Sequence, residues 1–154
     1  MTLPCITVRQ PWARCIAVGE KLVENRGKTT SHRGLIAIHA GKTPDPLGDQ
    51  DPRVLRLFGE DPRLSASVGA IVAVATLVGC HQASPIWPTC CAPWGEVLHY
   101  GPSGKSRPAH HLVLADVVRL DRPVPVRGQV RVPWSAPAEV EAAVRAQLAE
   151  AGVR

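Results

Sequence analysis

The chain has 154 residues and a mass of 16.5 kDa, enough for one domain with its own hydrophobic core. No apolar stretch is long and charge-free enough to cross a bilayer. Arg9 and Arg14 interrupt the early apolar positions, so no secretory signal is predicted and we expect a cytoplasmic protein without membrane contact. Five cysteines, an odd number, indicate reduced thiols rather than a disulfide framework.

The formal net charge of +5 is unevenly distributed along the chain. Residues 1–42 carry seven Lys and Arg against two Glu, and residues 101–131 carry six against two acidic residues. Residues 43–100 and 132–154 are net negative, at −3 and −1. If the two positive segments lie side by side, they form a basic face suited to a polyanion. A mildly basic surface scattered around the molecule is the alternative.

The first half of the chain predicts short strands and short helices. Pro11 suits a first helical position, and Trp12 and Ile16 recur at helical spacing, so a helix is expected to Ala17, ended by Gly19. Asp51-Pro52 is expected to begin a second helix, which runs to about Phe58 and ends at Gly59. Alternating apolar positions predict strands over residues 3–8, 22–26 and 34–39.

The second half predicts longer strands and a final helix. Residues 68–78 form an apolar stretch typical of a buried strand, and two late strands are expected over 112–120 and 124–132, separated by a Pro-containing turn. The irregular stretch 82–108 contains Trp87 and Trp94, which predicts either a lid that offers a stacking surface or a loop packed on the sheet. An amphipathic helix is expected over about 136–151, with Val140, Val144 and Leu148 on one stripe.

The octet from Gly19 to Arg26 places two cations and two carboxylates in one short segment. Arg26 can bind phosphate with its forked guanidinium, and Lys21 can act as a mobile point charge. Glu24 can accept a hydrogen bond from an exocyclic amine. The octet therefore predicts a groove for a polar, anionic ligand, and a solvated ion-pair cluster is the alternative.

Three blocks in this order resemble the ASCH (activating signal cointegrator homology) family. They are the sequence ITVRQPWA at 6–13, the G-x-K-x-x-E-x-R run at 19–26, and RGLIAIHAGK at 33–42. Two later segments, GAIVAVA at 69–75 and HLVLADV at 111–117, resemble core strands of the same family. The resemblance therefore spans residues 1 to about 134.

The resemblance implies a fold and a function. The fold would be α+β and PUA-like, a small mixed β-barrel over about 1–134 with flanking helices and a C-terminal helix, in a single domain over 1–154. The function would be binding of RNA or another single-stranded nucleic acid, or of a nucleotide-like small molecule, in a charged cleft. The residues that would line it are Gln10 and Trp12 as one wall, Lys21, Glu24 and Arg26 as the floor, and His39 and Lys42 as the rim.

Two other functions remain open. Some small members of the family hydrolyse N4-acetylcytidine, and others have been assigned nuclease activity. In the amidohydrolase branch a Lys is followed three residues later by a Thr, and here Glu24 follows Lys21 instead. In an enzyme of this kind Lys21 would be nucleophile or base, and Glu24 the proton acceptor. The third function is a protein-interaction module in transcription regulation.

Soft metal ligands occur in two pairs, Cys80-His81 and Cys90-Cys91. Zinc ligands usually come in pairs separated by two to four residues. Because each pair here is adjacent in sequence, we expect that the four do not converge on one ion, and we predict neither a metal nor another cofactor. His110-His111 has no Cys or carboxylate at ligand spacing and is expected to face solvent.

Overall fold

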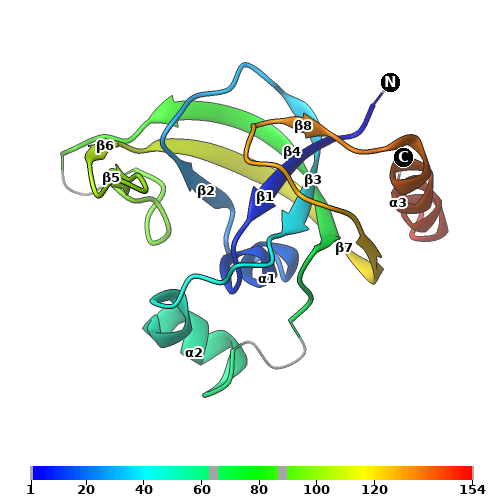
Figure 1. The fold of residues 1–154 in the computed structure, drawn as a ribbon, viewed down its shortest axis with the longest axis horizontal. Coiled ribbons are helices and arrows are strands. Elements are labelled where there is room, and N and C mark those ends of the chain that lie inside the picture. Colours follow the sequence, from blue (N-terminus) through cyan, green and yellow to red (C-terminus); the bar gives the residue numbers. More distant parts are fainter. Residues whose placement is uncertain (1, 63–65, 87–89, 154) are drawn as a thin grey trace.

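A computed structural model describes residues 2–62, 66–86 and 90–153 of the chain. The chain forms eight strands, three α-helices and one short 3-10 helix within these ranges (Figure 1). In chain order they are β1 (Pro4–Val8), α1 (Trp12–Ala17), β2 (Val23–Arg26), β3 (Gly34–Ala40), η1 (Gly48–Gln50), α2 (Pro52–Phe58), β4 (Ala70–Gln82), β5 (Leu98–Tyr100), β6 (Ser106–Pro108), β7 (His110–Pro125), β8 (Trp134–Ser135) and α3 (Ala138–Glu150). No described helix is both long and apolar enough to cross a membrane.

Six strands form one mixed sheet in the order β2-β7-β4-β3-β1-β8, and β5 and β6 form a separate hairpin. β1 pairs with β3 in parallel, and the other neighbours are antiparallel. This arrangement confirms the predicted α+β class. The expected closed barrel is not seen, because β2 and β8 end the sheet and no pairing joins them in the described part of the chain.

The sheet buries apolar side chains on both faces, and a different helix covers each face. Side chains alternate across a strand, so Ile6 and Cys5 of β1 belong to opposite clusters. One cluster packs against α1 through Ala13, Ile16 and Ala17. The other packs against α3 through the predicted stripe of Val140, Val144 and Leu148. Figure 1 shows the long strands β4 and β7 arching over α1, with α3 beyond the arch.

The short helices begin and end where the sequence predicted. The Asp51 carboxylate caps α2 by accepting from the backbone N–H of Arg53 at 2.8 Å. Gly59 ends α2 with a φ of 77°, and Gly19 follows α1 with a φ of 82°. Both values lie in the left-handed region that glycine adopts at little cost.

The prediction of two late strands is wrong, because residues 110–125 form the single strand β7. β2 pairs with β7 only over residues 110–113, so the only described strand that pairs with the rest of β7 is β4. Pro123 and Pro125 lack an N–H group, and a strand with one open side tolerates them. Three register shifts between β4 and β7 let this long pair bend.

The stretch 82–108 is less irregular than predicted, because it contains the β5–β6 hairpin. Its strands have three residues each, too few for a visible alternation of apolar side chains. Gly104 provides the positive φ of 74° at the turn. Trp87, for which a stacking or packing role was expected, lies outside the described residues.

A buried side chain, Gln147, connects α3 to the sheet. The side-chain amide of Gln147 donates to the carbonyl of Arg122 at 2.8 Å and accepts from the backbone N–H of the same residue at 2.9 Å. Gln147 is buried, so its loss would leave both backbone groups short of partners.

Gln147→Ala is expected to lower the free energy of unfolding by about 1–3 kcal/mol, because two backbone groups lose their partner. Urea unfolding of the variant and wild type measures the change. Gln50→Ala, at an exposed position in η1, is the matched control and should change stability little. Equal losses in both variants would show that the amide bridge contributes nothing specific.

Candidate functional site

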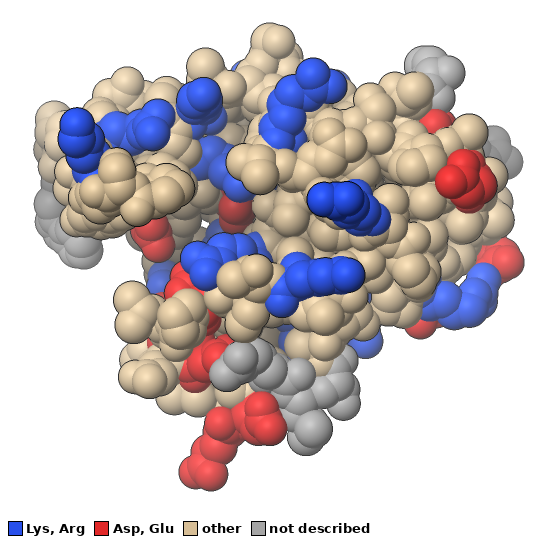
Figure 2. Space-filling view, in the orientation of Figure 1, with Lys and Arg blue, Asp and Glu red and all other residues tan. Residues whose placement is uncertain are grey.

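A cleft of about 820 Å³ lies where the sheet is open between β1 and β2. Figure 2 shows a hollow between the β5–β6 hairpin and the body of the molecule, with Lys and Arg side chains on its borders. The lining comes from β1, α1, the octet, the segment before α2, and residues 94–100. Trp12, Lys21, Glu24 and Arg26 of the predicted site all line this cleft.

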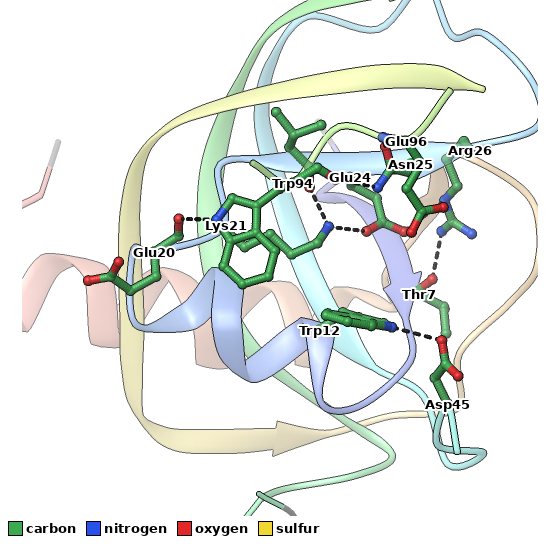
Figure 3. Close-up of polar contacts among 11 residues, drawn as sticks. Thr7, Trp12, Glu20, Lys21, Glu24, Asn25, Arg26, Asp45, Trp94 and Glu96 are labelled. Atoms are coloured by element: carbon green, nitrogen blue, oxygen red, sulfur yellow. Dashed lines mark hydrogen bonds and ion pairs between the residues drawn. The ribbon is translucent and has the colours of Figure 1, made fainter. Parts of the chain in front are cut away.

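Glu24 lies between two cations at the floor of the cleft (Figure 3). The Lys21 ammonium donates to Glu24 Oε2 at 3.2 Å and to the carbonyl of Val23. The Arg26 Nε lies 3.5 Å from Glu24 Oε1. Lys21 is 3% and Glu24 8% exposed, so these two side chains form a buried ion pair and not the solvated cluster considered as the alternative, whereas Glu20 of the octet is exposed.

Arg26 also connects two strands that are not paired with each other. Its Nη2 donates to the carbonyl of Thr7 at 2.6 Å, from β2 to β1. A guanidinium forms such bonds with fixed geometry because its donors are coplanar. The bond therefore sets the width of the sheet opening, and the cleft lies in that opening.

Two tryptophans form the aromatic walls of the cleft. The Trp12 Nε1 donates to Asp45 Oδ2 at 2.9 Å, and the Trp94 Nε1 donates to the carbonyl of Glu20 at 2.9 Å. The ring centroids are 6.3 Å apart at an interplanar angle of 76°. Because both indole N–H groups already have partners, what the rings offer a ligand is their apolar surface.

Arg53 supports the Trp94 wall from the side of α2. Its guanidinium carbon lies 4.4 Å from the Trp94 ring centroid, a cation–π distance. The same guanidinium pairs with Asp51 at 2.5 Å. The hydrogen bond from Arg53 lowers the pKa of Asp51 below its ordinary value and outweighs the opposing effect of burial. This pair therefore stays charged at neutral pH and orients the Arg53 guanidinium that contacts Trp94.

Glu96 is a further carboxylate of the cleft, and the sequence did not indicate it. Desolvation raises its pKa above the ordinary value; the charge of Lys21 opposes this shift and that of Glu24 reinforces it. Asn25 positions the part of the cleft wall that Trp94 and Glu96 form. Its side-chain amide donates to the carbonyl of Trp94 and accepts from the N–H of Glu96, both at 2.9 Å.

Gln10 does not line the cleft. Its side chain is buried, donates to the carbonyl of Ser67 at 2.8 Å and accepts from the backbone N–H of Arg14 at 3.0 Å. Gln10 therefore stabilises the start of α1, and through α1 it helps to position Trp12.

His39 and Lys42 line a second cleft, of about 970 Å³, that adjoins the first. The two clefts share Thr7, Arg9 and Arg26. His39 is almost fully buried, with Nε2 2.9 Å from the carbonyl of Val126 and its ring against Trp134. It shapes the wall, while Lys42 is exposed and available to a ligand.

The two clefts differ in charge. The lining of the first balances Arg9, Lys21, Arg26 and Arg53 against Glu24, Asp45, Asp51 and Glu96. Among the described residues of the second lining, the charged side chains are Arg9, Arg26, Lys42 and Arg127, with no carboxylate. The two positive segments of the sequence also meet, because β2 pairs with β7 and Arg127 lines the same cleft as Lys42.

The structure corrects two predictions about residues 80–111. His111 does not face solvent: it is fully buried, and its Nε2 lies 2.8 Å from the carbonyl of Glu96. The expectation that the four soft ligands do not converge holds only for Cys80, because His81, Cys90 and Cys91 meet at His111. Cys80 lies apart from them, with its Sγ 3.4 Å from Thr29 Oγ1.

No protein-family model and no curated protein sequence matches this chain. Solved structures do match. The crystal structure of an ASCH protein from Zymomonas mobilis is similar over 94% of both chains, with a TM-score of 0.57 and 15% identity. Two single-substitution variants of that ASCH protein are also similar. The first has a TM-score of 0.57 and 14% identity over 95% of this chain and 98% of its own. The second has a TM-score of 0.56 and 16% identity over 94% of this chain and 95% of its own. The chain therefore has an ASCH-like fold, as its motifs predicted.

His39 should make stability depend on pH. Burial lowers its pKa from the ordinary 6.5, with a smaller opposing effect of the hydrogen bond to Val126. The unfolded chain then binds a proton at His39 at higher pH than the folded protein does. The free energy of unfolding should therefore fall as pH drops below about 6.5, until the folded-state pKa is passed.

His39→Phe removes the titrating ring and tests this directly. The variant should be less stable at neutral pH because it loses the bond to Val126, yet its stability should change less with pH. Denaturant unfolding of both proteins across pH 5 to 7.5, the window around the ordinary histidine pKa, measures the two slopes. Identical slopes would contradict the assignment.

Proposed function

We propose that this protein binds single-stranded RNA, with one base in the first cleft and neighbouring phosphates along the second. The observation that carries the proposal is the pairing of two adjoining clefts of different chemistry that share Thr7, Arg9 and Arg26. A nucleotide chain has the same alternation, since its bases are flat and neutral and its phosphates are anionic. The ASCH-like fold is consistent with this function.

The first cleft suits a base that has left its stack. Trp12 and Trp94 offer ring surface, and base–aromatic stacking contributes about 1–3 kcal/mol per base. Glu24 is a buried acceptor for an exocyclic amine, and the flanking cations are donors for ring carbonyls. Only an unpaired strand presents its base edges in this way, so the proposal specifies single-stranded RNA.

The second cleft suits the phosphates. Lys42 and Arg127 are exposed, and the described lining brings no carboxylate against them. Arg9 stands at the junction and is partly committed to the protein, since it donates to the carbonyls of Thr43 and Pro44 at 3.3 and 2.8 Å. These bonds hold the Arg9 guanidinium at the point where a bound RNA strand would pass from one cleft to the other.

A second candidate function is hydrolysis of an amide on a modified nucleoside such as N4-acetylcytidine. The observation that favours it is the burial of Lys21 and Glu24 as a bonded pair in a cleft that also contains Glu96. A desolvated lysine beside carboxylates is an arrangement suited to proton transfer. Glu24 replaces the hydroxyl residue of the family's amidohydrolase branch, and for that reason we place binding first.

A labelled single-stranded RNA oligonucleotide should bind with an affinity that falls as salt rises, because bound phosphates release counterions. Substituting both Lys42 and Arg127 by Ala should weaken binding and reduce the slope of log K against log salt by roughly 0.7 per lost contact. Trp94→Ala should weaken binding by about 1–3 kcal/mol while leaving that slope unchanged.

Arg119→Ala is the matched control for these losses, because Arg119 is exposed on β7 and lines neither cleft. It should leave both affinity and slope unchanged. Fluorescence anisotropy at several salt concentrations provides all of these values. Absence of RNA binding at low salt, or binding indifferent to salt, would reject the proposal and favour the protein-interaction module.

Turnover distinguishes the two candidate functions. We expect the wild type to leave N4-acetylcytidine intact, as followed by chromatography of the nucleoside and assay of released acetate. Lys21→Met should lower RNA affinity by about 1.5–3 kcal/mol at most, because one charge-assisted hydrogen bond donor is lost. Glu24→Thr, which installs the amidohydrolase residue, tests whether the cleft can acquire the activity.

Thermal unfolding of Lys21→Met and Glu24→Thr must be measured alongside, because Lys21 is bonded to Glu24 in the interior and either change can lower stability. The hydrolase alternative predicts the opposite pattern for the same proteins. Efficient deacetylation by the wild type, abolished in Lys21→Met with little change in binding, would place the side chain in the transition state and show that binding is not the main function.

A further inference from the structure

Four metal-ligating side chains meet beside the cleft. His81 and His111 come from β4 and β7, and Cys90 and Cys91 come from the segment between β4 and β5. Their ligand atoms all lie within 4.8 Å of one another. Cys90 Sγ is 3.5 Å from His81 Nε2 and 3.4 Å from His111 Nδ1, and Cys91 Sγ is 3.7 Å from His81 Nε2.

We propose that His81, Cys90, Cys91 and His111 bind one zinc ion in a tetrahedral structural site. In a zinc tetrahedron with Zn–S near 2.3 Å and Zn–N near 2.05 Å, a sulfur and a nitrogen lie about 3.6 Å apart. Three of the four separations between sulfur and nitrogen are 3.4 to 3.7 Å, which surround that value. Two thiolates with two imidazoles in this geometry select zinc over the hard cations that prefer oxygen.

The two histidines are held ready for a metal by the sheet. His81 and His111 are register partners on neighbouring antiparallel strands, and their rings are 5.2 Å apart. The Nε2 of His111 lies 2.8 Å from the carbonyl of Glu96. A carbonyl only accepts, so Nε2 must carry the proton, and the Nδ1 lone pair then points toward the sulfurs. A second hydrogen bond of this kind is the usual way in which a zinc-binding histidine is oriented.

The backbone allows two adjacent cysteines to approach one point. Cys91 has a φ of 61°, a left-handed conformation that is costly for a residue other than glycine and recurs at ligand sites. The N–H of Ser84 lies 3.4 Å from Cys90 Sγ and donates to it, which helps to fix the position of this sulfur. Gly95 allows the segment that carries the two cysteines to lie close to His111, because a Cβ at position 95 would be only 2.7 Å from His111 Cε1.

The site would be closed and structural rather than catalytic. Four protein ligands complete the coordination of zinc and leave no position for water or substrate. The ion would fasten residues 90–91 to the ends of β4 and β7, next to the segment that carries Trp94 and Glu96. This inference does not depend on the RNA-binding proposal, because the ligands and their geometry are independent of what occupies the cleft.

The test uses the full chain, purified without a metal-affinity step and analysed for zinc by mass spectrometry. We expect one zinc per chain, a lower Tm after removal by a chelator, and recovery of the Tm when Zn²⁺ is added back. Replacement by Co²⁺ should give tetrahedral visible bands together with thiolate-to-cobalt charge-transfer bands. Bound cobalt without the thiolate bands would overturn the assignment.

Substitutions locate the site. His81→Gln and Cys91→Ser should lose the bound zinc, and His81 is exposed, so its replacement should leave the apo fold intact. Cys80→Ser is the matched control, because Cys80 is adjacent to His81 in sequence but outside the cluster, and it should retain the zinc. The proposal is rejected if wild-type apoprotein takes up no Zn²⁺, or if His81→Gln and Cys91→Ser bind as much zinc as the wild type.

Discussion

The cleft depends on the need to neutralise one buried carboxylate. Glu24 is 8% exposed, and a buried charge is stable only with close partners of opposite sign. Lys21 and Arg26 meet that need, and Arg26 also reaches across to the carbonyl of Thr7. The ion network therefore holds β2 at a set distance from β1. Direct strand pairing at this place would fill the space that the cleft occupies, so the open sheet and the cleft have a common origin.

Local patterns predicted those parts of the molecule that depend on neighbours in sequence. The end of α1 follows from Gly19, and the start of α2 follows from Asp51. The charged floor of the cleft follows from the octet, because Lys21 and Glu24 are three residues apart. The α3 stripe likewise follows from helical spacing. Each of these contacts spans only a few residues, so the spacing alone contained the information.

The remaining features depend on which distant strands become neighbours. The two late strands were predicted from prolines that act as breaks, but β7 continues through them because one of its sides is unpaired there. His111 was placed in solvent because nothing near it in sequence could bind it, whereas its partners lie on β4 and in the segment before β5. Glu96 enters the cleft through bonds from Asn25, about 70 residues earlier in the chain.

These long-range bonds also connect the proposed metal site to the cleft. The carbonyl of Glu96 orients His111, while the side chain of the same residue lines the cleft beside Lys21. The N–H of Glu96 is bonded to Asn25, which comes from the octet strand. A change at the cysteines would therefore reach the cleft through His111 and the backbone of Glu96. Because Asn25 binds the N–H of Glu96 independently of any metal, loss of a bound ion should loosen this wall without removing the ion network on the floor.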